Sequence, residues 1–453
     1  MDIIVVGCGK VGTSIAANLV AEGHNVTVVD KDADVIESIT NVHDVYGING
    51  NGTDIETLQD AGVGNCELLV ATTGSDEFNM LACFLAKRLG VANTIARIRK
   101  PEYNDKSLNF IKDELEISMA INPESLAANE MVSILKFPSA IKIETFSRGN
   151  FEMVEIRLKK DSELDGVRLC DLRSKYHAQV LVCAVQRGEK VYIPSGNFVL
   201  RGGDKIGITA SPSEITKFMR NLSIIQKKTR STMIIGGSRT AYYLAKSLLA
   251  AGNEVKIIEL DEQRCIELVE ALPDKAVILN NDGAQQDFLI ELGLRSVDAF
   301  VSLTGMDEEN ILLSYFANTN GVPKVISKVN REEFVRTAHR MGLECVISPK
   351  DIVSDRVVSY ARALENSRGS KVEALYKLMD GEAEALEFKV SGDFSHVDTP
   401  LKKLSLKPDT LIAGIIRDRK PIIPSGDDTI QAGDSVVVIT SGQILADLSD
   451  IVD

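Results

Sequence analysis

The segment 2–30 constrains the fold of this chain more strongly than any other part of the sequence. Residues 3–6 form an apolar run typical of a buried parallel strand, and residues 11–21 carry the apolar spacing of an α-helix. The pattern G-x-G-x-x-G over residues 7–12 joins the two, and residues 25–29 have the composition of a second strand. Together they predict the first βαβ unit of a dinucleotide-binding sheet.

Each glycine of the pattern has its own physical role. Gly7 makes the tight turn, Gly9 lets the backbone approach a pyrophosphate, and Gly12 allows the helix to pack closely on the strand. The helix N-terminus then presents free N–H groups to that pyrophosphate. Asp30 lies 23 residues after Gly7, close to the spacing of about 20 at which an acid meets a ribose diol. The alternative is an ordinary βα turn with a surface acid, but the context favours nucleotide binding.

The bulk composition limits the kinds of partner. The 453 residues have room for about three domains, and 44% hydrophobic and 26% charged residues are typical of a globular protein. A net charge of −14 argues against nucleic-acid binding, which needs a basic surface. No apolar run approaches the roughly 18 residues of a membrane span. The seven cysteines and five histidines are dispersed, so we expect neither a disulfide framework nor a metal site.

The chain carries the same plan twice. Residues 233–241 (MIIGGSRTA) repeat the strand and glycine turn of residues 5–12. An acid, Glu259, follows the first glycine of the second copy at the same interval of 23 residues as Asp30 in the first. The correspondence continues in 69–79 with 300–310, and in 96–97 with 327–328.

Short strands with Gly and Asp turns follow each α/β part and predict a small α+β subdomain at the end of each copy. The fold class is therefore α/β, with two tandem Rossmann-like doubly wound parallel-sheet domains, each followed by a small α+β subdomain. We expect Rossmann-like domains over 1–140 and 227–370, and small subdomains over 141–226 and 371–453.

A doubly wound sheet binds its ligand beyond the carboxyl ends of its strands, beside the point where the strand order reverses. In the first copy, the apolar runs place strands near 2–6, 25–29, 44–48, 67–72, 93–98 and 117–120. The glycine turn, Asp30, Thr73 and Arg97 all lie at or just past such ends. The predicted site is therefore at this edge of the sheet.

Other residues near these ends have two interpretations each. Thr73 and Gly74 leave room for a base or ribose, or form a plain turn. Arg97 and Arg99 would pair with phosphate or form surface ion pairs. Asp76 is expected to cap the helix over 77–90 rather than to act in catalysis. The polar loop 50–54 would either cap the next helix or contact adenine, and capping is the favoured interpretation. We expect no catalytic residue.

Two predicted helices, 124–136 and 351–365, connect the large domains to the small ones and carry apolar stripes. Such a stripe packs on its own domain or pairs neighbouring lobes, and the sequence leaves both possibilities open.

The second copy departs from the glycine pattern. Ser238 replaces Gly9 and Ala241 replaces Gly12, so a side chain narrows the approach to a pyrophosphate. Glu259 and Asp282 keep the chemistry for a ribose diol, and Arg239 adds a cation. Weaker, altered or absent binding are all consistent with this pattern.

The duplicated plan resembles one family, the TrkA proteins of Trk potassium uptake systems. The resemblance rests on the glycine motif, Asp30, the segments 71–79 and 95–99, and the paired small subdomains, and it covers essentially the full length. It implies a regulatory subunit with RCK (or KTN) lobes that is not an enzyme. Such a subunit is cytoplasmic, peripheral on the inner face of the cell membrane, and forms a homo-oligomeric, tetrameric ring under a potassium transporter subunit of the TrkH/TrkG type.

The resemblance also implies binding of NAD(H) and of ATP/ADP, at residues carried over by position. In the first copy these are Gly7, Cys8, Gly9, Lys10, Val11, Gly12, Asp30, Lys31, Thr73, Gly74 and Arg97. In the second copy they are Gly236, Gly237, Ser238, Arg239, Thr240, Glu259 and Asp282.

The residues themselves leave the nucleotide and part of the function open. An acid on the ribose disfavours NADP, but it does not separate NAD from ATP or ADP. We hypothesise that bound nucleotide shifts one lobe against its neighbour and that the ring transmits this shift to the pore. The acidic charge would favour docking on basic cytosolic loops of a membrane partner. An NAD-dependent oxidoreductase or a stand-alone nucleotide sensor are the alternatives.

Overall fold

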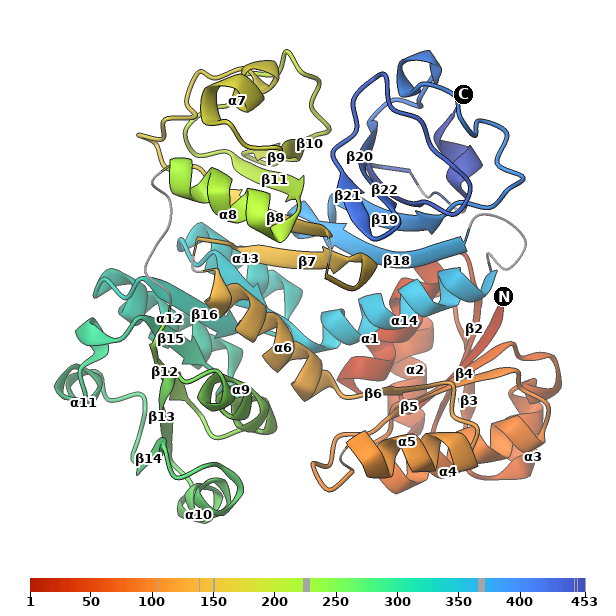
Figure 1. Ribbon diagram of the computed structural model, residues 1–453. Coiled ribbons are helices and arrows are strands. Elements are labelled where there is room, and N and C mark those ends of the chain that lie inside the picture. Colours follow the sequence, from red (N-terminus) through yellow and green to blue (C-terminus); the bar gives the residue numbers. More distant parts are fainter. Residues whose placement is uncertain are drawn as a thin grey trace. The chain divides into compact units, whose positions relative to one another are not determined.

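The computed structural model describes residues 1–103, 105–137, 139–149, 151–222, 229–365, 371–443, 445 and 447–452. They form two compact units (Figure 1). Unit 1 combines Met1–Val132 with Arg230–Ala361, and unit 2 combines Ser133–Thr229 with Arg362–Asp453. Each unit therefore contains one part of each copy of the repeat. Among the described residues, no helix is both long and apolar enough to span a membrane.

Unit 1 contains two six-stranded parallel sheets, one in each α/β lobe, with the strand orders β3-β2-β1-β4-β5-β6 and β14-β13-β12-β15-β16-β17. The first lobe has β1 (Asp2–Val6), β2 (Asn25–Asp30), β3 (Tyr46–Asn49), β4 (Leu68–Ala71), β5 (Asn93–Arg97) and β6 (Met119–Ile121). The second lobe has β12 (Ser231–Ile235), β13 (Glu254–Glu259), β14 (Ala276–Asn280), β15 (Ala299–Ser302), β16 (Lys324–Lys328) and β17 (Cys345–Ile347). Both orders reverse beside the first strand, so the Rossmann-like class is confirmed.

Helices cover both faces of each sheet (Figure 1). Ile4 and Val6 belong to the buried cluster that contains Cys83 of α4. Since successive side chains of a strand point to opposite faces, Ile3 and Val5 are buried on the other side, where α1 and α2 pack. The helices of the first lobe are α1 (Lys10–Ala21), α2 (Ala33–Val42), α3 (Ile55–Asp60), α4 (Asp76–Arg88) and α5 (Asp105–Glu114), with the short turn η1 (Val63–Asn65). Those of the second lobe are α9 (Arg239–Ala250), α10 (Glu262–Ala271), α11 (Gln286–Glu291), α12 (Asp307–Thr319) and α13 (Glu332–Arg340), with η3 (Leu294–Ser296).

The connecting helices α6 (Pro123–Lys136) and α14 (Pro349–Glu365) pair each lobe with the other. The buried Ser354 of α14 donates its hydroxyl to the carbonyl of Ser14 (3.1 Å) and accepts from the Asn18 amide (2.6 Å), both on α1. Asn122, just before α6, donates to the Tyr243 hydroxyl of α9 (3.0 Å). The structure thus shows lobe pairing by these helices within one chain.

Unit 2 contains two five-stranded antiparallel sheets with equivalent orders, β10-β9-β11-β8-β7 and β21-β20-β22-β19-β18. They share one apolar cluster, in which Phe151 of the first sheet meets Ala413 and Val437 of the second. The first subdomain has β7 (Lys142–Phe146), η2 (Ser147–Gly149), β8 (Phe151–Arg157), α7 (Leu169–Tyr176), β9 (Leu181–Arg187), β10 (Lys190–Tyr192), β11 (Lys205–Ala210) and α8 (Pro212–Asn221). The second has β18 (Lys371–Leu378), η4 (Met379–Gly381), β19 (Ala383–Lys389), η5 (Leu401–Lys403), β20 (Thr410–Arg417), β21 (Lys420–Ile422), β22 (Ser435–Thr440) and η6 (Leu448–Ile451). The predicted small α+β subdomains are confirmed.

Candidate functional site

The glycine turn of the first lobe is held by backbone geometry and by one carboxylate. Gly7 has φ +91°, and a Cβ there would lie 2.8 Å from the backbone nitrogen of Thr73, so glycine is required at this turn. Asp30 accepts the N–H of Cys8 (2.6 Å) through one oxygen and the N–H of Asp32 (3.0 Å) through the other. Each oxygen keeps a further lone pair for a hydroxyl donor. Asp30 therefore positions the turn and retains capacity for a ribose.

The N-terminus of α1 is open. Gly9 is the N-cap residue, and among the described residues no side chain caps this helix end. A Cβ built on Gly9 would meet nothing within 4 Å, whereas one on Gly12 would collide with the carbonyl oxygen of Gly7. Gly12 is thus needed for packing of the helix on the turn, and Gly9 leaves free space in front of the helix. An uncapped N-terminus with its dipole is suited to an anion.

In the second lobe, side chains of the lobe itself form hydrogen bonds with the equivalent turn. Gly236 again has a positive φ, +92°, and Glu259 accepts the N–H of Gly237. Ser238 caps α9, its hydroxyl accepting the N–H of Ala241 (3.4 Å). Arg264 donates from Nε to the carbonyl of Gly237 (2.6 Å). The two turns have the same backbone conformation and differ in the side chains that form hydrogen bonds with them.

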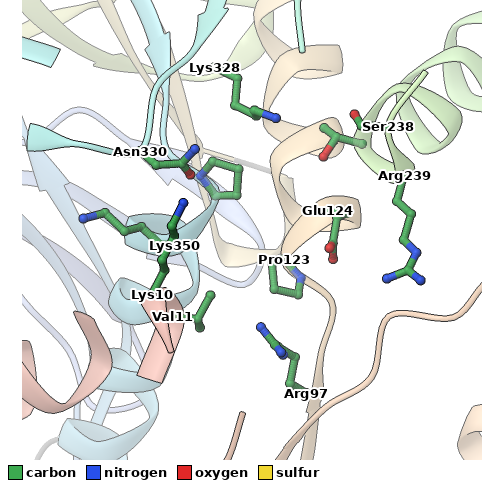
Figure 2. Close-up of a pocket in the computed structure, with 12 residues that line it drawn as sticks. Lys10, Val11, Arg97, Pro123, Glu124, Ser238, Arg239, Lys328, Asn330 and Lys350 are labelled. Atoms are coloured by element: carbon green, nitrogen blue, oxygen red, sulfur yellow. The ribbon is translucent and has the colours of Figure 1, made fainter. Parts of the chain in front are cut away.

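A cavity of about 460 Å³ opens between the two lobes of unit 1 (Figure 2). The first residues of four helices, α1, α6, α9 and α14, contribute to its wall, so four positive dipole ends surround it. Its lining residues are Lys10, Val11, Arg97, Pro123, Glu124, Ser238, Arg239, Thr240, Lys328, Asn330, Pro349 and Lys350.

The lining carries five cationic side chains and one carboxylate, that of Glu124. Four of these cations form two equivalent pairs across the lobes, because Lys10 and Arg97 of the first lobe correspond in the repeat to Arg239 and Lys328 of the second. Figure 2 shows these side chains around the same opening as Glu124. Such an excess of positive charge, together with four helix N-termini, suits a multiply charged anion.

Burial without enough negative charge depresses the basicity of two of these groups. Burial, followed by the nearby guanidinium of Arg99, lowers the pKa of Arg97 to about 10, and Arg239 contributes in the same direction. Burial also lowers the pKa of Lys328, with a smaller contribution from Lys10. The Nε atom of Arg97 and the Oε2 atom of Glu124 are buried and have no hydrogen-bond partner among the described residues. Buried polar atoms without protein partners are suited to a group that is not part of the protein.

Six of the predicted site residues line this cavity: Lys10, Val11, Arg97, Ser238, Arg239 and Thr240. The others lie around the two turns. Thr73 donates its N–H and hydroxyl to the side-chain oxygen of Asn79, and its carbonyl accepts from Arg97. The carbonyl of Gly74 accepts from the Arg99 guanidinium (2.6 Å).

Two predicted residues make only local contacts. Lys31 is exposed, directly after Asp30. Asp282 accepts the N–H of Ala284 (2.9 Å) and so closes a turn in its own loop. Both therefore lie on the rim of their loops rather than in the cavity.

One prediction about this edge of the sheet is wrong. Ser75, not Asp76, caps α4, its hydroxyl accepting the N–H of Phe78. Asp76 is the first helical residue, and its carboxylate accepts the N–H groups of Arg99 and Lys100 (2.8 Å each). Both N–H groups bind the same oxygen, Oδ2, and the Arg99 guanidinium lies 3.7 Å from the other, so the carboxylate of Asp76 faces the segment after β5 rather than the start of its own helix. The helix cap predicted for the loop 50–54 is confirmed, and the structure shows that Asp54 provides it for α3 by accepting the N–H of Thr57.

Sequence reasoning missed half of the cavity wall. Lys328 was detectable, since it occupies the position of Arg97 in the second copy. Glu124 and Lys350 lie at the starts of the helices that follow the last strand of each sheet, the edge at which ligands are expected. The lobe pairing that brings them to one cavity leaves no signal in the local sequence.

Comparison with known proteins supports this description. The TrkA-N domain matches residues 3–123 and 232–349, and the TrkA-C domain matches residues 153–223 and 393–453. The fold and site thus define a protein with two TrkA-N domains, each followed by a TrkA-C domain. The Trk system potassium uptake protein TrkA homolog of Archaeoglobus fulgidus is 30% identical over 452 residues, which cover 100% of both chains. The chain belongs to the TrkA family of Trk potassium uptake systems.

Other relatives and solved structures agree. The Trk system potassium uptake protein TrkA of Haemophilus influenzae is 29% identical, over 97% of this chain and 96% of its own. The crystal structure of the GsuK RCK domain has a TM-score of 0.63 at 15% identity, covering 97% of this chain and 92% of that one. A structure described as the GsuK channel bound to NAD has a TM-score of 0.63 at 14% identity, covering 97% and 77%. These similarities show that the fold is of the RCK type.

Proposed function

We propose that this chain is the nucleotide-binding regulatory subunit of a potassium uptake system and that it acts by changing conformation rather than by catalysis. The observation that carries this proposal is the cationic cavity next to the open N-terminus of α1. The family relatives are named as potassium uptake proteins, which supplies the process that is regulated.

The first-lobe site fits an adenosine nucleotide from ribose to phosphates. Asp30 would accept the ribose hydroxyls, and Gly9 would let a phosphate reach the free N–H groups of α1. From there, further phosphates would extend toward Lys10, Arg97 and the second lobe. ATP and ADP satisfy the positive charge of the cavity most completely, because their terminal phosphates carry the most negative charge. NAD(H) would bind the same glycine turn and Asp30. It would, however, place a second nucleoside, rather than terminal phosphates, beside the cationic side chains of the cavity.

The proposed binding residues of the first lobe are those that the sequence predicted. In the first lobe they are Gly7, Cys8, Gly9, Lys10, Val11, Gly12, Asp30, Lys31, Thr73, Gly74 and Arg97. The second lobe adds Arg239, Thr240 and Lys328 to the phosphate end.

Regulation follows from a site that both lobes share. A ligand shifts a conformational equilibrium only by its different affinity for the two states. Phosphates between the lobes would offset the repulsion among the cations and favour the paired arrangement. We propose that a ring of these chains, tetrameric in its simplest form, couples this pairing to a membrane potassium transporter subunit of the TrkH/TrkG type, on the cytoplasmic face of the membrane.

Substitution of the ribose acid tests the proposal. Asp30→Asn removes the charge while retaining an oxygen that can accept the Cys8 N–H. We expect at least a tenfold loss of affinity for both ADP and NADH in calorimetry, because hydrogen bonds to a charged acceptor are worth roughly 1.5–3 kcal/mol. Nucleotide control of potassium uptake should be lost in parallel.

Asp32→Asn is the matched control. It makes the same change in charge two residues away, at a position that caps α2 and where asparagine also caps well. Equal losses in the two variants, or nucleotide control that survives in Asp30→Asn, would contradict the proposed role of Asp30.

A further inference from the structure

We infer that the chain binds one nucleotide, at the first lobe, because the second lobe occupies its own phosphate position with the side chains of Ser238 and Arg264. This inference rests on the proposed function and specifies which half of the molecule carries the site. Ser238 is then the residue that separates the two lobes.

The backbones of the two turns are the same at the position that differs. Gly9 has φ −67° and ψ −174°, and Ser238 has φ −62° and ψ 169°. Any residue adopts this extended conformation, so the backbone does not require glycine at position 9. No neighbour requires it either, since a Cβ there meets nothing within 4 Å. The space in front of Gly9 is therefore reserved for something outside the protein.

In the second lobe, the side chain of Ser238 occupies the equivalent space and binds a backbone N–H group of the helix N-terminus. The hydroxyl of Ser238 accepts the N–H of Ala241, one of the groups that a phosphate would bind at a helix N-terminus. Arg264 holds the carbonyl of Gly237 and is itself fixed by an ion pair with Glu267 (2.6 Å). In the first lobe Val35 occupies the position of Arg264, and the equivalent carbonyl, that of Cys8, accepts from the small hydroxyl of Thr13 instead (2.9 Å). A phosphate entering the second turn would have to displace groups that the first turn lacks.

The second lobe keeps a role at the shared cavity. Arg239, Thr240 and Lys328 line it, although the turn beside them is blocked. The second lobe thus supplies charge to a nucleotide held by the first lobe. The repeat has become asymmetric, with one binding lobe and one supporting lobe.

Stoichiometry measured with ADP on the full chain tests this inference. We expect the unmodified chain to bind one ADP, and the double variant Ser238→Gly/Arg264→Ala to bind two. The reciprocal variant Gly9→Ser should lose ADP binding at least tenfold, since a serine there would cap α1 as Ser238 caps α9. Gly9→Ser is expected to fold, given the free space around Gly9, and thermal unfolding checks this.

The outcomes separate the inference from the proposed function. Two equivalent ADP per unmodified chain would overturn the inference and leave the proposed function intact. A folded double variant that still binds one ADP, or a folded Gly9→Ser variant with unchanged affinity, would also overturn it. If the unmodified chain bound neither ADP nor NADH, the proposed function itself would fail, and this inference with it.

Discussion

At the scale of single residues, Arg97 shows how this site is prepared for a ligand. Its guanidinium is partly buried beside other cations, and burial lowers its pKa to about 10. A cation whose pKa is lowered on folding decreases the free energy of unfolding while it is charged, and this destabilisation is complete at every pH below about 10. A bound phosphate would offset this destabilisation. In its proposed role, Arg97 would exchange stability of the empty protein for affinity.

Replacement of Arg97 by an apolar residue should separate these two effects. We expect Arg97→Met to raise the melting temperature of the nucleotide-free protein and to weaken ATP binding by roughly tenfold to a hundredfold, the range of one charged hydrogen bond. Differential scanning fluorimetry and calorimetry measure the two quantities. Arg99→Met is the control, since Arg99 donates to Gly74 and lies near Asp76, and its loss should destabilise the protein. A less stable Arg97→Met protein with unchanged affinity would contradict the argument.

Single residues also show where sequence reasoning reaches its limit. The roles of Gly7 and Gly12 were predictable, because turn geometry and close packing depend on immediate neighbours. The role of Asp76 was not, because its partners are backbone groups that follow the next strand. A carboxylate near a helix start has several possible donors, and only the fold decides which of them is near.

At the scale of elements, the connecting helices determine how the lobes meet. Their apolar spacing predicted helices but not the surface on which they pack. The structure shows that α14 is fixed to α1, the helix whose N-terminus faces the cavity, by Ser354 with Ser14 and Asn18. Because α14 also begins at the cavity with Pro349 and Lys350, one helix contacts both the proposed phosphate end and the binding helix. If nucleotide binds as proposed, this arrangement would link occupancy of the site to lobe pairing.

Removal of the buried hydroxyl in this contact should weaken the pairing. Ser354→Ala removes the acceptor of the Asn18 amide and the second hydrogen bond to the Ser14 carbonyl, which also accepts within α1; an unsatisfied buried donor costs roughly 1–3 kcal/mol of unfolding free energy. Urea denaturation measures this loss. In a double-mutant cycle with Asn18→Ala, the two changes should be less than additive, because they remove the same hydrogen bond. Fully additive losses would show that Ser354 acts independently of Asn18.

At the scale of the whole molecule, duplication explains both what was predictable and what was not. Each copy repeats the same series of strands, so the two doubly wound parallel sheets, and the edge at which such a sheet binds a ligand, follow from the sequence. The cavity does not, because its wall is complete only when two lobes face one another. Lys10 and Arg239 are 229 residues apart in the chain and line one opening. No sequence pattern within either copy indicates that these two residues line the same cavity.

A site shared in this way makes a prediction about nucleotides of different length. Arg239→Ala, in the second lobe, should weaken ATP binding about tenfold and leave AMP binding nearly unchanged, because in the proposed orientation only the outer phosphates would extend from the first-lobe turn toward Arg239. Calorimetry with both nucleotides gives the comparison. Arg295→Ala is the matched control, since it removes the same charge from the same lobe at a residue bonded to Asn320 outside the cavity. If Arg239→Ala weakened AMP and ATP binding equally, the nucleotide would have to bind in another orientation. If Arg239→Ala and Arg295→Ala weakened ATP binding equally, the effect would come from the net charge of the lobe and not from a contact with Arg239. A loss confined to ATP and to Arg239 would mean that the second lobe senses the phosphates of a nucleotide held by the first.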